Sequence, residues 1–218
     1  MSFDWSAVIA ALPQLLQGAE LTVFIAAIGL ILGISGGMLL GMLRAFGPMP
    51  VNALVQVYVA FIRGTPLIVQ IMFIYFALPI LMHVRIQGVT AGIIAIAINS
   101  SAYVAEIVRG SLLSISKGLT EAGLAMGLPF WKVLVFITGP LAFRRLIPPL
   151  GNQCITSLKD TSLLLVIGVS ELTFTGQEII ADNFRAVEIW SAVAVIYFVM
   201  LSAVGLFWQY VERRMPIL

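Results

Sequence analysis

The chain has 218 residues, of which 61% are hydrophobic and only 10% are charged, and its mean hydropathy is +1.07. Soluble domains carry about 25% charged residues, so this composition indicates a membrane protein. The formal net charge of +2 is too small to predict a nucleic-acid partner. Cys154 is the only cysteine, which excludes an intramolecular disulfide and a cysteine-based metal cluster. Residues 1–5 show neither the basic region nor the cleavage site of a signal peptide, so no cleavage is expected.

Apolar runs bounded by charges or by glycine and proline clusters predict five membrane-spanning helices, because each span needs about 20 apolar residues. The predicted spans cover residues 20–43, 54–80, 88–112, 137–168 and 187–210. No internal repeat relates them. We therefore expect an all-α membrane protein in which residues 1–218 form a single transmembrane domain.

The first predicted span carries a stripe of glycines, namely Gly29, Gly33, Gly36, Gly37 and Gly41. Small residues spaced four positions apart let two membrane helices approach closely. We expect this stripe to pack against another helix.

The second predicted span is interrupted by Arg63, Gly64, Thr65 and Pro66. Pro66 removes a helical hydrogen-bond donor and disfavours helical geometry at Thr65, so a break or kink is predicted. Irregular backbone at membrane depth must contact protein or water. The segment is therefore either a gate or hinge beside a transport path or the true start of the span.

The third predicted span has a polar face formed by Asn99, Tyr103, Glu106 and Gly110. Glu106 also has Arg109 three residues later, which is close enough for an ion pair on the helix surface. This face is either a packing seam between helices or part of a transport path, since polar side chains serve both purposes in membranes.

The fourth predicted span contains four charged residues, Arg144, Arg145, Lys159 and Asp160. If all four faced lipid, the cost would be about 10–14 kcal/mol. Helical spacing puts five residues on one face: Arg145, Pro149, Asn152, Thr156 and Lys159. That face should line a water-filled path or a protein interface. Alternatively, the arginine pair lies at the headgroups, and Lys159 and Asp160 form a structural ion pair.

Basic residues gather at the same ends of the predicted spans, at Arg44, Arg109, Lys117, Lys132, Arg213 and Arg214. The segment between spans four and five instead holds three acidic residues and one arginine. The positive-inside rule therefore places the N-terminus outside, and the C-terminus and the loop between spans three and four in the cytoplasm.

That loop contains the sequence E-A-G-L-A-M-G at residues 121–127, followed by Ile137 and Pro140. It resembles the EAA loop of permease subunits of bacterial ABC importers, with Gly123 where alanine is usual and Gly139 where leucine is usual. The resemblance implies a coupling loop over about residues 113–136. Its contacts with a cytoplasmic ATPase would be made by Glu121, Ala122, Gly123 and Gly127.

Further motifs extend the resemblance along the chain, at residues 61–66, 106–110, 148–153 and 159–163. They are similar to the polar-amino-acid branch of these permeases. Segments typical of its glutamine permeases are residues 3–7, 176–181, 183–186 and 212–215.

The resemblance implies a type I ABC importer permease fold in the bacterial cytoplasmic (inner) membrane. The implied partners are a cytoplasmic ATPase dimer, a second permease subunit that we expect to be an identical copy, and a periplasmic or extracellular amino-acid-binding protein. ATP and magnesium would be held by the ATPase, so this chain is expected to bind no cofactor or metal and to be no enzyme. It would move a polar amino acid, glutamine in the first place, by alternating access.

A zwitterionic amino acid needs a carboxylate near its ammonium group and hydrogen-bond donors near its carboxyl group. We expect Asp160 to supply the carboxylate, and Asn152 and Thr161 to be among the donors. Further residues expected along the path are Lys159, Tyr103 and Glu106.

Two alternatives remain open at this point. The substrate could be another polar amino acid, such as glutamate, histidine, arginine or cystine. The chain could also be an ion-coupled secondary transporter with Glu106 and Asp160 as proton carriers, because acids inside the membrane are typical of that class. Against this second reading stand the loop at residues 121–127 and the lack of an inverted repeat.

Overall fold

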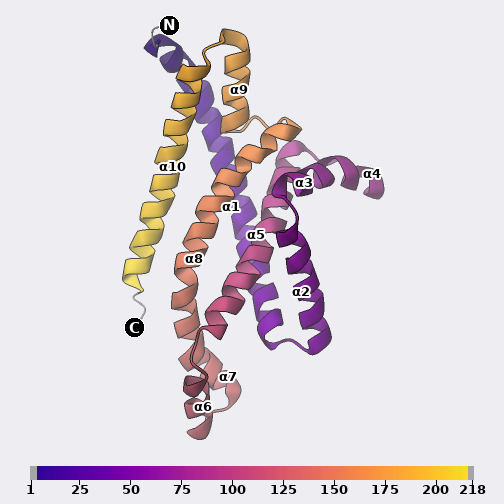
Figure 1. Cartoon of the computed structure of the whole chain (residues 1–218), viewed down its shortest axis with the longest axis vertical. Helices are drawn as coiled ribbons and strands as arrows, with labels where there is room; N and C mark the ends of the chain where they lie inside the picture. The colour runs from indigo at the N-terminus through magenta and orange to yellow at the C-terminus, as the bar shows by residue number, and fades with distance from the viewer. Residues whose placement is uncertain (1–3, 216–218) are drawn as a thin grey trace.

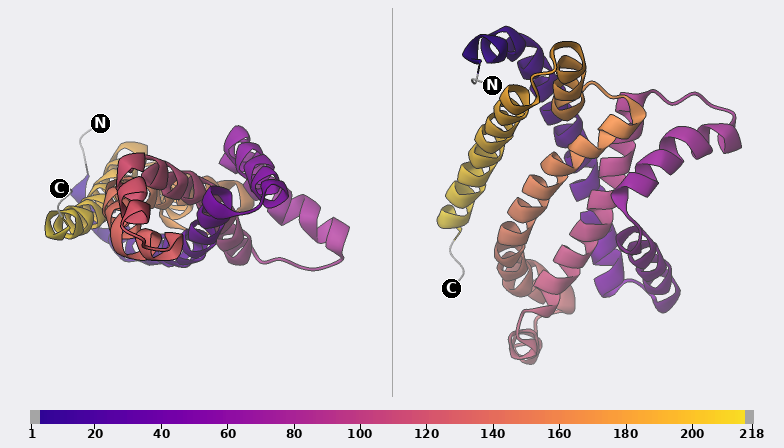
Figure 2. Two further views of the ribbon diagram at one scale, coloured as in Figure 1. Left: turned by 90° about the horizontal axis from the view of Figure 1, so that it is seen from below. Right: turned by 45° about the horizontal axis from the view of Figure 1, so that its top comes forward.

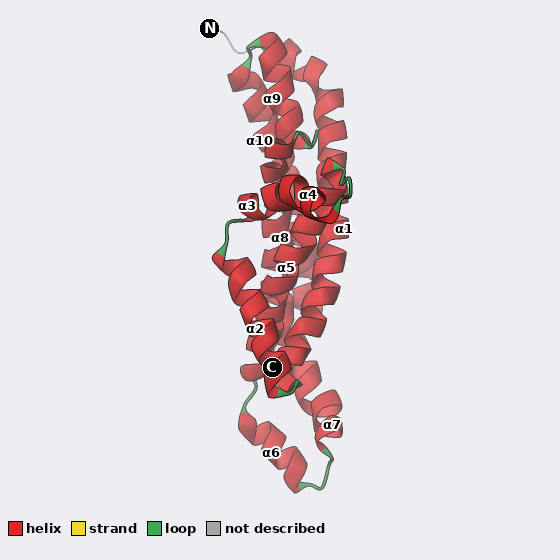
Figure 3. Cartoon of the chain, turned by 90° about the vertical axis from the view of Figure 1, so that its right-hand side faces the viewer, coloured by secondary structure: helices red, strands yellow, loops and turns green. Residues whose placement is uncertain are grey.

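The computed structural model describes residues 4–215, and within that range all regular structure is helical (Figure 3). The main helices are α1 (Trp5–Phe46), α2 (Met49–Gly64), α3 (Leu67–Met72), α4 (Leu78–Met82), α5 (Gly88–Leu113), α6 (Lys117–Ala125), α7 (Phe130–Val133), α8 (Gly139–Asp160), α9 (Leu172–Asn183) and α10 (Ala186–Arg214). Short π- and 3₁₀-helical pieces join some of them: η1 (Phe73–Ala77), η2 (Leu134–Thr138) and η3 (Thr161–Ile167).

Four described helical stretches are long and apolar enough to cross a membrane, namely Trp5–Phe46, Gly88–Leu113, Phe130–Ile167 and Ala186–Arg214. A bent helix pair, Met49–Gly64 with Leu67–Met82, gives a fifth candidate. The prediction of about five spans is therefore confirmed if the bent pair counts as one.

The first span begins earlier than predicted. Helix α1 starts at Trp5, where the side chain of Asp4 caps it by accepting a hydrogen bond from the Ser6 amide at 2.9 Å. The predicted start at residue 20 was wrong because Glu20 lies exposed on the helix surface and one carboxylate there does not end a helix.

The break in the second span is confirmed, and it is sharp. The helices on either side of Thr65 and Pro66 are bent by 103°. The break does not begin the helical structure of this region, because α2 is already helical from Met49. Beyond the break, α3 and α4 extend sideways from the other helices (Figures 1 and 2).

Helices α1 and α5 make the central contact of the fold, and the predicted glycine stripe lies in it. A Cβ atom added to Gly37 would lie 2.5 Å from Val104 Cβ, and one added to Gly33 would lie 2.6 Å from Ser100 Cβ. Gly36 lies at the margin, where an added Cβ would meet only Ser101 Cβ at 3.6 Å. The backbones of the two helices are therefore in close contact, as small residues permit.

The two ends of the molecule differ in their elements. Helix α9 lies beside the N-terminus at one end (Figure 1). Helices α6 and α7 and the turn between α1 and α2 lie toward the other end, as does the C-terminal end of α10 (Figure 1). The basic residues that guided the topology prediction therefore share one end.

Helix α9 is anchored by a buried carboxylate. Glu171 is fully buried and accepts hydrogen bonds from the Phe174 amide at 2.8 Å and from the Tyr197 hydroxyl at 3.1 Å. Burial raises the pKa of the Glu171 carboxyl group. The adjacent Leu172 amide donates to the hydroxyl of Thr22 at 3.1 Å. Helix α9 is thus tied to both α1 and α10.

We expect the substitution Gly37→Ala to destabilise the subunit by about 1–3 kcal/mol, because the new methyl group overpacks the contact with Val104. The matched control is Gly36→Ala, which adds the same methyl group at an ordinary van der Waals distance, 3.6 Å from Ser101 Cβ. Thermal unfolding of the two purified variants in detergent measures the difference. Equal melting temperatures for both variants would contradict the close packing described here.

Candidate functional site

A polar cavity of about 570 Å³ lies at the break in the second span. The break itself, from Arg63 to Leu67, forms one wall. The other walls come from α5, α8 and η3, through Asn99, Tyr103, Gln153, Thr156, Asp160 and Leu163. Residues far apart in the sequence therefore meet around one space.

The bend that shapes this cavity is held by Gln70, a residue that the sequence analysis did not single out. Its Nε2 atom donates to the Ile62 carbonyl at 2.8 Å and to the hydroxyl of Thr65 at 2.9 Å. Its Oε1 atom accepts from Asn99 Nδ2 at 3.2 Å. The carbonyl end of α2 thus gains the partner that Pro66 cannot provide. A glutamine shortly after a helix-breaking proline was the available signal.

Two residues of opposite charge face this cavity, Arg63 from the break and Asp160 from the end of α8. The Arg63 guanidinium lies 5.2 Å from the centre of the Tyr103 ring, which fits a cation–π contact. Its Nη1 atom is also 3.8 Å from Glu106 Oε2. The cavity can therefore present a cation and an anion to a small zwitterion.

Glu106 lies behind the cavity and joins three arginines. The predicted pair with Arg109 is confirmed, at 2.9 Å from Nη2 to Oε2. Arg44 from the end of α1 forms an ion pair with the other carboxylate oxygen, and Arg63 approaches from the break. The side chains of Glu106 and Arg44 are 17% and 14% exposed, so water screens this pair weakly. One carboxylate thus holds the ends of α1, α2 and α5 together.

The remaining predicted path residues lie outside the cavity lining. Asn152 and Lys159 are exposed on α8. Thr161 is fully buried, and its hydroxyl donates to the Leu158 carbonyl at 2.7 Å. Arg145 donates through Nη1 to the Ser114 carbonyl in the turn before α6. The single polar face expected on the fourth span is therefore divided between different surroundings.

The loop with the EAA-like sequence forms a protruding helix. Glu121 and Ala122 are exposed on α6, which lies at the end of the molecule (Figures 1 and 3). Gly123 faces inward, where an added Cβ would lie 2.8 Å from Val133 Cγ2. Gly127 has a φ of 81°, a conformation that favours glycine. Residues 130–136, expected at the end of the loop, are already helical.

These features define the class of the protein as a helical membrane transport component with a protruding helix at one end. A model of the family described as "Binding-protein-dependent transport system inner membrane component" matches residues 33–216. The glutamine transport system permease protein GlnP of Escherichia coli (strain K12) is 53% identical over 100% of both chains. The arginine transport system permease protein ArtQ of Bacillus subtilis (strain 168) is 31% identical over 99% of this chain and 98% of its own.

Solved structures agree with this assignment. A chain in a crystal structure of an amino acid ABC transporter with histidines has a TM-score of 0.92 at 31% identity, covering 98% of this chain and 100% of that chain. An inward-facing structure of the MetNI methionine ABC transporter has a TM-score of 0.73 at 19% identity, covering 98% and 99%, and supports the fold alone. The chain belongs to the family of binding-protein-dependent transport system inner membrane components.

This membership confirms the expected ABC permease fold and the role of a membrane component rather than an ATPase. The family description names a dependence on a binding protein, which an ion-coupled secondary transporter does not need. The second alternative of the sequence analysis is therefore not supported.

We expect Glu106→Gln to destabilise the subunit by up to about 3–5 kcal/mol, because three arginines lose their shared counter-charge. Arg63 is 43% exposed and contributes the least to this loss. Thermal unfolding in detergent measures the effect. The double variant Glu106→Gln with Arg109→Gln removes one of the uncompensated cations and should recover part of the stability. An unchanged melting temperature in the single variant would contradict the role assigned to Glu106.

Proposed function

We propose that this chain is the permease subunit of an ATP-driven importer that carries glutamine across the bacterial inner membrane. The observation that carries the proposal is the 53% identity to a glutamine transport permease over the full length of both chains. The cavity chemistry supports it, because a small amino acid with an uncharged amide fits a site that offers both charges and several amides.

Within the cavity, Asp160 receives the ammonium group of the substrate and Arg63 lies near its carboxylate. Asn99, Gln153 and Thr156 offer hydrogen bonds to the side-chain amide. Together with Arg63 on α2, these residues come from three different helices, α2, α5 and α8, so the fit is sensitive to helix movement, as alternating access requires.

The other residues that were predicted to lie along the path have other roles. Tyr103 and Glu106 position Arg63, through the ring contact and the ion pair respectively. Asn152 and Lys159 lie on the exposed face of α8 and line a path that the second permease subunit completes. Thr161 supports the start of η3 through its bond to Leu158. The segment from Arg63 to Pro66 serves as the gate.

Coupling to ATP hydrolysis is assigned to α6. Glu121 and Ala122 are exposed on this helix, where a cytoplasmic ATPase can reach them, and Gly127 allows the sharp exit behind it. Gly123 packs against Val133 and thereby fixes α6 to the start of the fourth span. ATP-driven closure of the ATPase dimer would then move α8.

The same proposal sets the topology and the assembly. The basic end with α6 and the C-terminus faces the cytoplasm, and the N-terminus and α9 face outward, where a binding protein delivers the substrate. Two copies of the chain form the transport path. Supporting this, α3, η1 and α4 extend sideways from the other helices (Figure 2) and leave apolar residues such as Phe73, Ile80 and Leu81 exposed.

Uptake of radiolabelled amino acids tests the function. Liposomes would hold this chain with its ATPase and binding protein, and a panel of polar amino acids would be offered with and without internal ATP. We expect ATP-dependent uptake of glutamine. Uptake of a different amino acid would show that the substrate is not glutamine. Uptake without ATP would overturn the ATP-driven mechanism.

The coupling role of α6 is tested by Glu121→Ala. We expect the variant to insert normally while glutamine uptake and ATPase stimulation by the loaded binding protein both fall at least tenfold, since the ATPase contact is lost. Glu212→Ala is the matched control, because Glu212 is also an exposed carboxylate but belongs to the end of α10. Full uptake in the Glu121 variant would remove α6 from the coupling pathway.

The substrate role of Asp160 is tested by Asp160→Asn, compared with Lys159→Gln on the neighbouring exposed position. We expect the first variant to lower glutamine uptake about tenfold or more, because a charge-assisted bond to the ammonium group contributes about 1.5–3 kcal/mol. Binding of the ATPase should remain unchanged. If Lys159→Gln causes the larger loss of uptake, the substrate binds elsewhere on α8.

A further inference from the structure

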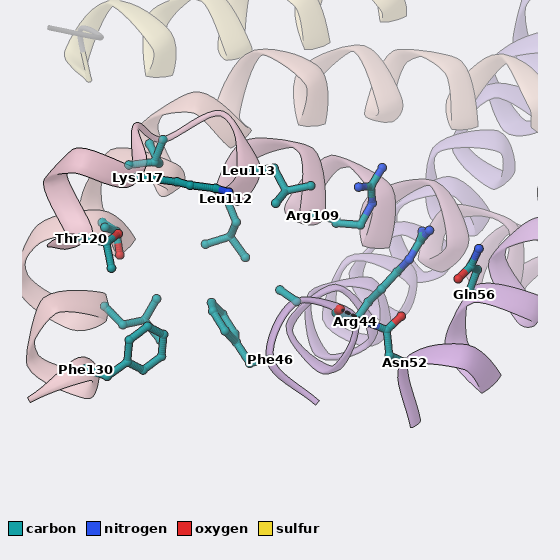
Figure 4. A pocket seen from close by; sticks show the side chains of 14 residues that line it. Arg44, Phe46, Asn52, Gln56, Arg109, Leu112, Leu113, Lys117, Thr120 and Phe130 are labelled. Carbon is teal, nitrogen blue, oxygen red and sulfur yellow. Dashed lines mark hydrogen bonds between the residues drawn. The ribbon is translucent and has the colours of Figure 1, made fainter. Parts of the chain in front are cut away.

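A second cavity, of about 420 Å³, lies at the basic end of the molecule, away from the polar cavity described above (Figure 4). It is open on one side and is lined by the end of α1, the start of α2, the end of α5, and by α6, α7 and η2. The proposed function makes no use of this space.

The walls of this basic-end cavity carry three cations, Arg44, Arg109 and Lys117 (Figure 4). Arg44 and Arg109 share one counter-charge, the carboxylate of Glu106, which Arg63 also approaches. Lys117 forms no ion pair with any residue in the part of the chain that the structure describes. The cavity therefore keeps an excess of positive charge and suits an anion.

The other walls combine apolar and polar surface, and a small soluble anion would not need the apolar part. Phe46 and Phe130 are about half exposed, and their rings meet edge to face with centroids 6.0 Å apart. Leu112 and Leu113 add further apolar surface, and Gln56 places an amide beside Arg44 (Figure 4). Apolar and cationic surfaces thus adjoin within one cavity.

The depth of the cavity favours a lipid over a soluble protein. Arg44 lies in the last turn of α1, and Arg109 lies about one turn before α5 ends at Leu113. Both helices are membrane spans, so these cations lie near the headgroup level. Glu121, which is assigned to the ATPase, does not line the cavity.

We propose that this cavity binds the headgroup of an anionic phospholipid of the cytoplasmic leaflet, such as phosphatidylglycerol. Lys117 contacts the phosphate, Arg44 and Arg109 add positive charge from the other side of the cavity, and the acyl chains leave past Phe46 and Leu113 (Figure 4). Basic pockets between membrane helices on the cytoplasmic side are suited to such headgroups. The inference rests on the orientation proposed above, in which this end faces the cytoplasm.

The test is native mass spectrometry of the detergent-solubilised complex of this chain with its ATPase, titrated with phosphatidylglycerol or with phosphatidylcholine of the same acyl chains. We expect preferential retention of phosphatidylglycerol. The variant Lys117→Gln should weaken this binding about fivefold, corresponding to about 1 kcal/mol for one cation. Lys117 is exposed and without an ion pair, so its replacement should leave folding intact.

The matched control is Lys132→Gln. Lys132 lies nearby on α7, but it contacts the Trp131 ring at 5.5 Å from the centroid and does not line the cavity. Equal affinities in wild type and the Lys117 variant, or an equal loss in the Lys132 variant, would overturn the proposed site.

Two further measurements distinguish a bound lipid from a free anion and from the ATPase. Millimolar inorganic phosphate should leave the bound lipid in place, and displacement by phosphate would show a site for free anions instead. Retention that disappears whenever the ATPase is bound would show that the ATPase fills the cavity, which also overturns the proposal. Glutamine uptake by the wild-type complex is measured in parallel. If the wild-type complex takes up no glutamine, the proposed function is contradicted, whereas lipid retention still tests the cavity by itself.

Discussion

A helix that is interrupted inside a membrane leaves carbonyl groups without partners, and the surrounding protein must satisfy them. In this chain Gln70 does so, because its Nε2 atom donates to the Ile62 carbonyl and the Thr65 hydroxyl. Asn99 in turn donates to Oε1 of Gln70. The 103° bend depends on these bonds. The polar cavity in turn depends on the bend, which turns the backbone from Arg63 to Leu67 toward α5 and α8. The proposed substrate site therefore follows from the way one broken span is satisfied.

Arg63 belongs to both polar centres of the molecule. It lines the cavity, and it also approaches the carboxylate of Glu106 together with Arg44 and Arg109. An anionic group that enters the cavity competes with Glu106 for the Arg63 guanidinium. When Arg63 turns toward the cavity, more of the Glu106 charge is available to Arg44 and Arg109. Occupancy of the cavity is thus linked electrostatically to the ends of α1 and α5.

Much of this arrangement could be predicted from the sequence wherever the cause was local. Pro66 ends α2 through its own ring, and Glu106 reaches Arg109 within one helical turn. Contacts between distant segments could not be predicted, because no periodicity relates Arg44 to Glu106 or places Gln70 beside Asn99. Asn152 and Lys159 share the expected helix face with Thr156 but lie outside the cavity, since α8 turns the adjacent side, with Gln153 and Asp160, toward it. Spacing gives a face of a helix, and only packing decides what that face meets.

The bonds around Glu171 have a mechanical consequence. Helix α9 packs on α1 and α10 through Leu172 and Ile179, and the Glu171 bond to Tyr197 and the Leu172 bond to Thr22 fasten it further. A force on α9 is therefore transmitted to two long helices, α1 and α10. A protein that pulls or tilts α9 therefore also moves α1 and α10, and the far ends of these two helices lie toward α6 (Figure 1).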